Sequence, residues 1–281
     1  MPGRLYLCAT PIGNLEDITY RAVRILKEVD LIAAEDTRHT KKLLNHLEIN
    51  TPLTSYHEHN KATKGPILIE KLKEGLNIAL VSDAGTPGIS DPGEDLVRLA
   101  HENNILVTPV PGASAVISGL IISGLSTRRF AFEGFLPADN KERKERLKKL
   151  SKEDRTIVLY EAPHRLSKTL EALYEALGNR KISIIRELTK QYEEVKQCTL
   201  EESIIYYQEV SPKGEFVLVI EGLSDEEMKE IEIKKWETIS IDEHFKLYID
   251  EGKDQKEAMK LVAKDRGISK REVYQIIHQI K

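Results

Sequence analysis

Short apolar runs alternate with longer segments of helical periodicity over most of the chain. Apolar runs are typical of buried strands, whereas apolar residues spaced three and four apart are typical of amphipathic helices. Strands are expected at residues 4–10, 31–36, 53–60, 77–83, 105–110, 130–136, 156–165, 181–190 and 214–222. Helices are expected between them, at residues 12–30, 39–49, 61–74, 93–104, 113–125 and 166–179, and the charged segment 141–155 is a helix or a loop.

This alternation predicts an α/β fold with a mostly parallel sheet covered by helices. In such sheets ligands bind beyond the carboxyl ends of the strands. Two strand-to-helix connections are of this kind, VSDAGTPG at residues 81–88 and VTPVPGAS at residues 107–114. The pattern therefore indicates a candidate ligand site at these two connections.

The alternating pattern divides into two blocks and then stops. A second block begins near Phe130, and after residue 222 the sequence is rich in charged residues without a strand pattern. We therefore expect two α/β domains, residues 1–117 and 118–222, and a small C-terminal helical domain, residues 223–281.

The C-terminal segment has the spacing of a helix-turn-helix. Its apolar residues recur at helical intervals on both sides of Gly267, and Ser269 with Glu272 matches a capping box at the start of the last helix. A contact with RNA through Lys270 and Arg271 is one reading of this segment. A small three-helix packing module is the other, and the slight excess of acidic residues makes DNA an unexpected partner.

Composition sets the remaining bounds. The chain has 281 residues, 40% of them hydrophobic, and a formal net charge of −4, so any nucleic-acid contact must come from local basic patches. No apolar run is long enough to span a bilayer, and the N-terminus enters a strand-like run without a signal-peptide pattern, so a cytoplasmic protein is expected. Cys8 and Cys198 lack metal-like spacing, and a disulfide between them is not expected.

The stretch VSDAGTPGISDPG, residues 81–93, ends an apolar strand in a loop rich in glycine and proline. Glycines allow a ligand to approach the backbone closely, and prolines reduce the entropy lost when the loop is ordered. Chain geometry alone is the alternative explanation. The sequence contains neither the P-loop pattern nor the dinucleotide fingerprint nor a Cys/His cluster, so a glycine-cradled phosphate and a metal site are not expected.

Several motifs occur in order and together carry a family resemblance. They are LYLCATPIGNLEDITYRA, AAEDTR, VSDAGTPGISDPG, PVPGASA, FEGFLP, YEAPHR and RELTK, between about Arg4 and Gly222. With these motifs the chain resembles the bacterial 16S rRNA 2'-O-ribose methyltransferases that modify cytidine 1402. Those enzymes have the tetrapyrrole methylase fold of the class III S-adenosylmethionine methyltransferases. DAGTPGISDPG and YEAPHR are the most specific motifs, because porphyrin-type enzymes of the same fold carry a different glycine loop.

The resemblance implies two α/β domains of the tetrapyrrole methylase type with S-adenosylmethionine in a cleft between them. It places cofactor contacts on the loop after the VSD strand, on the PGAS turn and on three segments of the second domain. The cofactor-binding residues carried over are Asp83, Ala84, Gly85, Thr86, Pro87, Pro111, Gly112, Ser114, Phe135, Leu136, Leu188, Gly214 and Phe216.

A ribose hydroxyl is a weak nucleophile, so methyl transfer to it needs alignment and a group that accepts its proton. Glu35 and Asp36, at the end of LIAAED, are the candidate catalytic residues, and His57 and His59 are further candidates. The alternative for the two carboxylates is a helix cap or an ion pair with Arg38. Because the sulfonium charge disappears in the transition state, few carboxylates are expected at the transfer site.

Binding of RNA requires cations that neutralise phosphates. The candidate RNA-binding residues flank the motif loops and are Arg38, Arg128, Arg129, His164, Arg165 and Lys190. The dense run at residues 141–149 has mixed signs and can equally be a solvated helix face. The resemblance also implies a homodimer formed through the α/β domains and a ribosomal small-subunit substrate, and no membrane partner is expected.

Two other functions remain open on the sequence alone. One is a methyltransferase of the same fold that acts on a tetrapyrrole or on a diphthamide-type substrate, because a fold does not determine a substrate. The other is an RNA-binding or assembly factor without turnover. An intact cofactor loop and the basic residues near it favour the rRNA methyltransferase.

Overall fold

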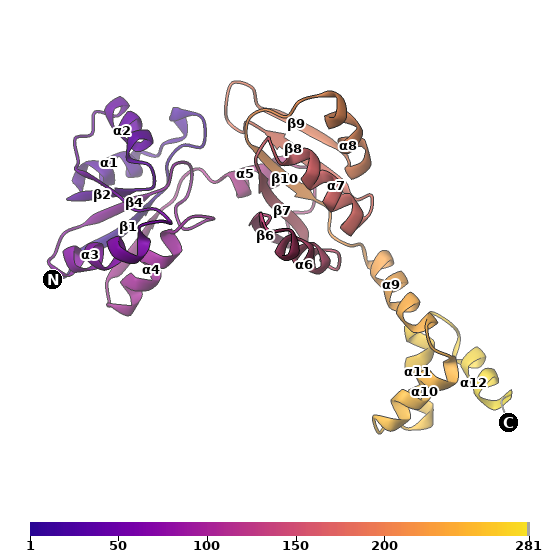
Figure 1. Cartoon of the computed structure of the whole chain (residues 1–281). Coiled ribbons are helices and arrows are strands. Elements are labelled where there is room, and N and C mark those ends of the chain that lie inside the picture. The colour runs from indigo at the N-terminus through magenta and orange to yellow at the C-terminus, as the bar shows by residue number, and fades with distance from the viewer. Residues whose placement is uncertain (280–281) are drawn as a thin grey trace. The chain divides into compact units, whose positions relative to one another are not determined.

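The computed structural model describes residues 1–279, which form two compact units (Figure 1). The first unit contains Met1–Leu150 and Arg155–Glu221 and holds both β-sheets. The second unit contains Ser151–Asp154 and the chain from Gly222 onward, and its regular structure is helical. Each unit has an apolar core of its own.

The first sheet has five parallel strands in the order β3-β2-β4-β1-β5. These strands are β1 (Arg4–Cys8), β2 (Leu31–Ala34), β3 (Leu53–Ser55), β4 (Ile78–Val81) and β5 (Leu106–Val110). Every residue of β4 is buried, as the apolar run predicts for a central strand with both faces covered.

Helices cover both faces of this sheet (Figure 1). On one face α1 (Tyr20–Glu28) and α2 (Thr37–His46) pack their apolar residues against β1, β2 and β4. On the other face lie α3 (Lys61–Lys73) and α4 (Gly93–Glu102). A short 3₁₀ helix, Leu15–Asp17, precedes α1. The parallel direction of the strands brings all five carboxyl ends to one edge, which is where the site lies.

The second sheet also has five strands, in the order β6-β7-β10-β8-β9. They are β6 (Phe130–Phe135), β7 (Thr156–Glu161), β8 (Lys181–Arg186), β9 (Glu194–Thr199) and β10 (Phe216–Ile220). Only β6 and β7 are parallel, whereas β10 runs antiparallel to β7 and β8, and β9 antiparallel to β8. The amino end of β10 therefore lies beside the carboxyl ends of β7 and β8.

The second sheet is covered on one face by α6 (Asn140–Leu150), α7 (Leu166–Leu177) and α8 (Leu200–Glu209). The helix α5 (Ala115–Ile122), which follows the last strand of the first sheet, covers the opposite face. Its residues Val116 and Leu120 pack among Val158, Ile185 and Val217. This cluster also contains Ile12 and Leu188, so it connects the two sheet regions of the first unit.

The structure corrects two expectations about this region. A mostly parallel sheet is right for the first five strands and wrong for the second five, because an apolar run shows burial but not direction. The pattern also missed β9 and α8. None of the β9 residues is buried, and an edge strand with the sequence EVKQCT has no apolar run to reveal it.

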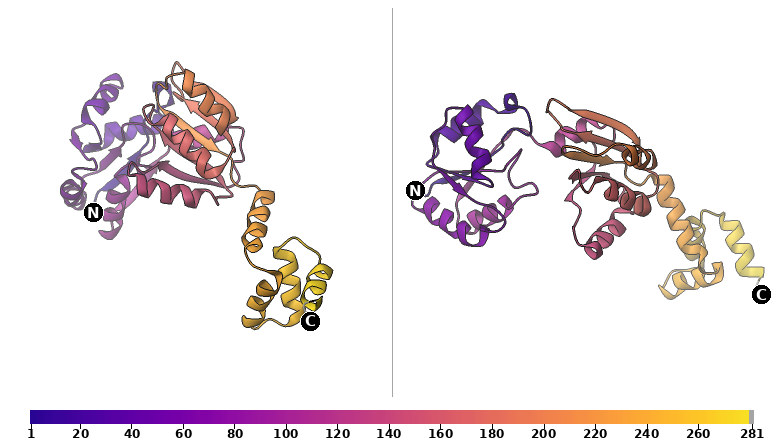
Figure 2. Two further views of the ribbon diagram at one scale, coloured as in Figure 1. Left: turned by 45° about the vertical axis from the view of Figure 1, so that its right-hand side comes forward. Right: turned by 45° about the horizontal axis from the view of Figure 1, so that its top comes forward.

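The second unit consists of α9 (Asp225–Glu237), α10 (Ile241–Asp250), α11 (Gln255–Asp265) and α12 (Lys270–Gln279). Figure 2 shows these four helices from two further directions. Val262, Ala263 and Val273 form the centre of its small core. The expected capping box of α12 is confirmed, since the Ser269 amide donates to Glu272 Oε2 at 2.7 Å and the Glu272 amide donates to Ser269 Oγ at 3.2 Å. Within residues 1–279, no helix is both long and apolar enough to cross a bilayer.

Candidate functional site

A pocket of about 650 Å³ lies in the first unit where strand ends of the two sheets face each other. From the first sheet it is lined by residues just beyond β1, β2 and β4 and at the start of α5. From the second sheet it is lined by the ends of β6 and β7, the loop after β8 and the amino end of β10. The antiparallel direction of β10 is what brings residues 215–217 to this edge.

The loop after β4 is tied to the loops after β1 and β5. Gly85 and Thr10 exchange two backbone hydrogen bonds of 3.1 and 2.9 Å, and Thr86 Oγ1 donates to the Ala113 carbonyl at 3.0 Å. Gly85 has φ +81°, and a Cβ there would lie 3.0 Å from Ile12 Cγ2. Glycine is needed at this position because the left-handed conformation and the close approach both disfavour a side chain.

Asp91 holds the rest of this loop. Its carboxylate accepts hydrogen bonds from the Gly88 amide at 2.9 Å and from the Gly93 amide at 2.7 Å. Ser90, which precedes Asp91, has φ +67°. A Cβ on Gly134 of β6 would lie only 2.7 Å from Ser90 Oγ. The aspartates and glycines of DAGTPGISDPG therefore keep a preformed loop at the pocket edge.

The wall from the second sheet includes a strained loop after β8. Glu187 and Thr189 have φ values of +51° and +66°, which non-glycine residues rarely adopt. Glu187 Oε1 accepts from the Glu215 amide at 2.9 Å and from Lys190 Nζ at 2.9 Å. A Cβ on Gly214 would lie 2.5 Å from Glu187 Cγ, so this glycine leaves room for the Glu187 side chain. Backbone strain of this kind is concentrated at functional sites.

Aromatic side chains form the base of this wall. The rings of Phe135 and Tyr160 pack edge to face with centroids 5.7 Å apart. Burial raises the pKa of Tyr160, and a hydrogen bond with the Val116 backbone at the start of α5 partly offsets this. The two rings give the pocket an apolar surface beside its polar loops.

Glu35 and Asp83 cross-link the ends of β2 and β4. Asp83 Oδ1 accepts from the Asp36 amide at 2.9 Å. The pKa of Glu35 is raised, first by burial and then by the neighbouring Asp83 carboxylate, although a hydrogen bond from the Asp83 backbone opposes the rise. Asp91 raises the same pKa further, and His57 lowers it. A half-buried carboxylate with a raised pKa is a suitable proton acceptor.

The pocket has more carboxylates than the sequence led us to expect. Glu35, Asp83, Asp91, Glu161 and Glu215 all line it. The side chains of Asp83, Asp91 and Glu161 accept hydrogen bonds from backbone amides, and that of Glu215 accepts one from a lysine. Most of the carboxylates in the pocket lining are therefore present because they hold the surrounding loops.

The predicted cofactor-binding residues fall into two groups. Those that line the pocket are Asp83, Ala84, Gly85, Thr86, Ser114, Phe135, Leu188 and Phe216. Those that do not are Pro87, Pro111, Gly112, Leu136 and Gly214. The second group lies beside the first in the chain, where for example a Cβ on Gly112 would lie 2.9 Å from Ala9 Cβ.

The two predicted catalytic residues differ in position. Glu35 lines the pocket, whereas Asp36 does not. Asp36 caps α2 by accepting from the Arg38 amide at 2.8 Å, and it forms a 2.7 Å ion pair with Arg38 Nη2. His57 and His59 lie outside the pocket lining, with ring centroids 6.1 Å apart.

The predicted RNA-binding residues are also separated. His164 and Lys190 line the pocket, and Arg38, Arg128, Arg129 and Arg165 do not. Arg165 Nη2 donates to the Leu136 carbonyl at 2.6 Å, and its Nε lies 3.5 Å from Glu161 Oε1. Arg165 is thus part of the framework of the YEAPHR turn.

Sequence reasoning missed the role of Glu161. Its side chain is fully buried, and it accepts from the Ala162 amide at 2.8 Å and from Thr169 Oγ1 at 2.6 Å. These bonds hold the turn that presents Ala162, Pro163 and His164 to the pocket. A carboxylate at the end of a buried strand is the signal that could have found it.

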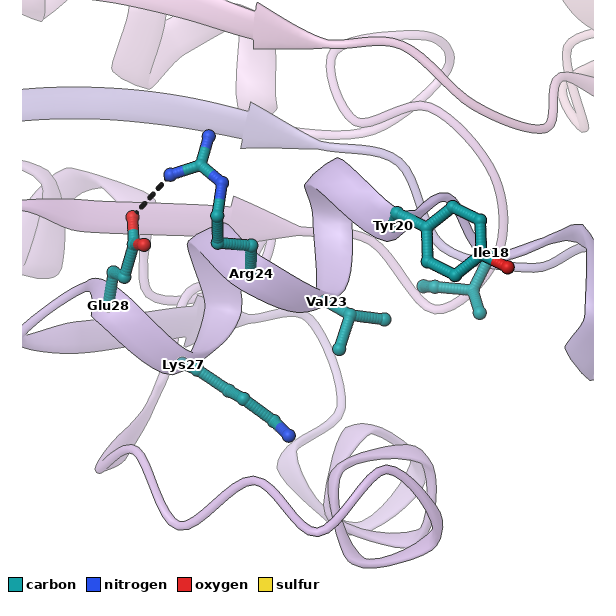
Figure 3. Close-up of a pocket in the computed structure, with 6 residues that line it drawn as sticks. All are labelled: Ile18, Tyr20, Val23, Arg24, Lys27 and Glu28. Carbon is teal, nitrogen blue, oxygen red and sulfur yellow. Dashed lines mark hydrogen bonds and ion pairs between the residues drawn. The ribbon is translucent and has the colours of Figure 1, made fainter.

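A second depression lies on α1 and is shown in Figure 3. Its lining is Ile18, Tyr20, Val23, Arg24, Lys27 and Glu28. Arg24 and Glu28 pair with each other at 2.6 Å, and both are exposed. The Glu28 carboxylate is thus already paired within α1, and this depression lacks the chemistry of the larger pocket.

Comparison with known proteins agrees with this geometry. Residues 4–203 match the family model of the Tetrapyrrole (Corrin/Porphyrin) Methylases. Diphthine synthase has a similar fold, with a TM-score of 0.61 and 14% identity over 79% of this chain and 91% of that one. Uroporphyrin-III C-methyl transferase from Thermus thermophilus complexed with S-adenyl homocysteine also has a similar fold. Its TM-score is 0.56, with 18% identity over 78% of this chain and 97% of that one.

The chain belongs to the tetrapyrrole methylase family, and this confirms the expected fold class. It is therefore a methyltransferase, and S-adenosylmethionine is its methyl donor. Within the family it is similar to proteins named ribosomal RNA small subunit methyltransferase I. The one from Halalkalibacterium halodurans is 54% identical over 99% of this chain and 95% of that protein. The one from Bacillus subtilis is 53% identical over 98% and 94%.

The pocket fits S-adenosylmethionine in size and in chemistry. Its volume of about 650 Å³ lies within the usual range for small-molecule sites. Bare backbone at Gly85 allows close approach, Ile89 and Leu188 offer apolar surface for an adenine, and Asp83 offers a carboxylate for an ammonium or hydroxyl group. Among the described residues no cluster of metal-ligating side chains is found.

Proposed function

We propose that this protein transfers a methyl group from S-adenosylmethionine to the ribose 2'-hydroxyl of cytidine 1402 in 16S rRNA of the small ribosomal subunit. The observation that carries the proposal is the similarity to named small-subunit rRNA methyltransferases along nearly the whole chain. A preformed pocket with a half-buried carboxylate of raised pKa supports it.

The residues of the pocket would divide the work between binding and proton transfer. The backbone of Ala84 and Gly85, with Asp83, Ile12 and Leu188, would hold the cofactor, which supplies an electrophilic methyl group when bound. Glu35 would accept the proton of the ribose hydroxyl, because a carboxylate of raised pKa is a stronger base than an exposed one. Asp36 would act indirectly, through the cap of α2.

Positioning of the nucleotide would come from the opposite wall. His164 is exposed on the YEAPHR turn, and Lys190 lies at the pocket edge, where it is paired with Glu187 and Glu215 at 2.9 Å. Arg128 and Arg129 are exposed and lie outside the pocket lining, where phosphate contacts would position the RNA. Alignment of the hydroxyl with the methyl group contributes on the order of 7 kcal/mol or more in favourable cases.

The proposal is tested by methyl transfer from radiolabelled S-adenosylmethionine to small ribosomal subunits that lack the modification. The RNA is digested and its nucleosides are separated. Label in 2'-O-methylcytidine is expected. Label in another nucleoside, or in none despite cofactor binding, would contradict the proposed substrate.

Three further features belong to the proposal. A homodimer formed through the α/β domains is expected, and sedimentation of the full chain would measure it. A cytoplasmic location follows from a ribosomal substrate. Domain boundaries at residues 117/118 and 222/223 predict that mild proteolysis separates the helical segment first, because cleavage falls preferentially between compact units.

A further inference from the structure

The last thirty residues are basic, although the second unit as a whole is not. Residues 222–251 contain ten acidic residues and four lysines, whereas residues 252–281 contain four acidic residues and eight lysines and arginines. The division falls between α10 and α11 (Figure 1). The segment that contains the α11–α12 helix-turn-helix is therefore net positive, whereas the preceding segment with α9 and α10 is net negative.

The four acidic residues within residues 252–281, the basic half of the second unit, form hydrogen bonds or ion pairs inside that unit. Asp254 caps α11 by accepting from the Glu257 amide, and Glu272 completes the capping box of α12. Asp265 accepts from the Tyr248 hydroxyl, and Glu257 lies 3.5 Å from Lys253. Each acidic residue of this half is therefore already engaged.

Five cations of the helix-turn-helix are exposed and pair with no acidic group in residues 1–279. They are Lys256, Lys260, Lys264, Lys270 and Arg271. Three of them follow one another at intervals of four along α11, which places them along one side of that helix. The other two begin α12 after the turn at Gly267, which has φ +63°.

Exposed aromatic rings follow the cations on α12. Tyr274 is 53% exposed, and its ring centroid lies 4.1 Å from that of His278. Lys270, Tyr274 and His278 are spaced by four and share one side of the helix. Cations beside exposed rings can contact phosphates and stack on unpaired bases, which is how proteins recognise single-stranded or looped RNA.

We infer that the α11–α12 helix-turn-helix is an RNA-binding surface that adds affinity for the ribosomal RNA without taking part in methyl transfer. The inference rests on the proposed function for the identity of the RNA. Duplex DNA is the usual ligand of a helix-turn-helix, but a helix that exposes paired aromatic rings favours unpaired bases.

The test uses the full chain with three cations neutralised, Lys260→Gln/Lys270→Gln/Arg271→Gln. The matched control removes the same charge from the acidic half of the unit, Lys234→Gln/Lys235→Gln/Lys246→Gln. Binding to protein-free 16S rRNA is measured over a range of salt concentrations, with cofactor affinity as a check on the first unit and far-UV circular dichroism as a check on the helices.

The test variant is expected to bind the RNA at least tenfold more weakly, with a salt dependence reduced by about three counterions, while the control behaves as the wild type. At saturating small subunits its rate of methyl transfer is expected to equal that of the wild type. Tyr274→Ala is expected to weaken RNA binding several-fold without changing the salt dependence.

Equal RNA affinity in the test variant, the control and the wild type would overturn the inference. Equal losses in both variants would overturn it as well, because bulk charge would then be the cause. Competition by duplex DNA as effective as by RNA, or binding to subunits but not to protein-free RNA, would assign the surface to another partner. Absence of methyl transfer by the wild type would instead refute the proposed function, and the binding comparison would still be decisive for this surface.

Discussion

Gly85 shows how one residue without a side chain shapes the pocket. Its φ of +81° is held by two hydrogen bonds with Thr10, and the Ile12 side chain occupies the space beside it. Glu35 shows the opposite case, in which the position of a side chain changes its chemistry. Burial and the carboxylate of Asp83 make its ionised form less favourable than that of an exposed glutamate.

Gly85→Ala is expected to lower the free energy of unfolding by about 1–2 kcal/mol, the usual penalty for a left-handed alanine. It is also expected to weaken S-adenosylmethionine binding at least tenfold, because the new Cβ crowds Ile12 at the pocket wall. Gly252→Ala is the matched control, since Gly252 has φ +86° and no neighbour within 4 Å of an added Cβ. Calorimetric titration should find the affinity loss in Gly85→Ala alone, and equal affinities would contradict the cofactor site.

Glu35→Gln is expected to reduce kcat by a factor on the order of 10² to 10⁴, the usual effect of losing a general base. Asp36→Asn keeps a side chain that can cap α2, and little change in kcat is expected from it. The comparison separates the two candidate carboxylates. A larger loss in Asp36→Asn would move the proton acceptor away from Glu35.

The same Glu35→Gln variant has an expected effect on stability. Because the folded-state pKa of Glu35 is raised, the protonated form favours folding, and this contribution is lost as pH rises through that pKa. The variant should therefore melt at a higher temperature than the wild type at pH 8, and the difference should vanish once the pH falls below the ordinary pKa of a glutamate. Thermal melts of both proteins across this range would measure it, and a difference independent of pH would exclude titration of Glu35 as its cause.

At the scale of elements, the turn between β7 and α7 is built around a buried charge. Glu161 accepts one bond from its own turn and one from Thr169 in the following helix, and Arg165 lies 3.5 Å away. Removing one partner of a buried carboxylate costs more than the bond itself contributes, because the charge is left unsatisfied. The position of His164 at the pocket therefore depends on the hydrogen bond between Glu161 and Thr169 of α7.

Thr169→Val is expected to lower the free energy of unfolding by about 1–3 kcal/mol, since valine fills the space but cannot donate to Glu161. Thr169→Ser keeps the hydroxyl and is expected to cost less. Urea denaturation of the first unit compares the two variants. Equal losses would assign the effect to packing of the lost methyl group and not to the hydrogen bond.

At the scale of the whole molecule, the two units can be followed separately because the chain has a single tryptophan, Trp236, in the second unit. His244 stacks on it with ring centroids 3.7 Å apart, and Arg266 Nε donates to His244 Nδ1 at 3.2 Å. Burial and Arg266 lower the pKa of His244, although Asp265 opposes this. The imidazole is therefore neutral in the folded unit at neutral pH.

The tryptophan emission is expected to report loss of stability of the second unit in acid. A histidine with a lowered folded-state pKa contributes stability above its ordinary pKa of 6.5, and this is lost as the pH falls through the folded-state value. His244→Phe keeps a ring against Trp236 and should remove the dependence. Denaturation followed by fluorescence at several pH values measures both proteins, and an unchanged dependence in the variant would assign it to another group.

The sequence by itself determined the strands of the first sheet, the helical C-terminal segment, the family and most of the loops that line the pocket. These features depend on local patterns, such as the buried run of β4, the capping pair Ser269 and Glu272, and the DAGTPGISDPG motif. Local patterns are visible in one dimension because each depends on residues close together in the chain.

Only the tertiary structure decided which residues meet. The direction of β10 brings Phe216 to the pocket that Gly85 also lines, and the fold separates Glu35, in the pocket, from Asp36, on a helix cap. The same holds for β9, an edge strand without an apolar run, which pairs with β8. Strand direction and strand pairing depend on contacts between distant segments, so no local pattern of the sequence contains them.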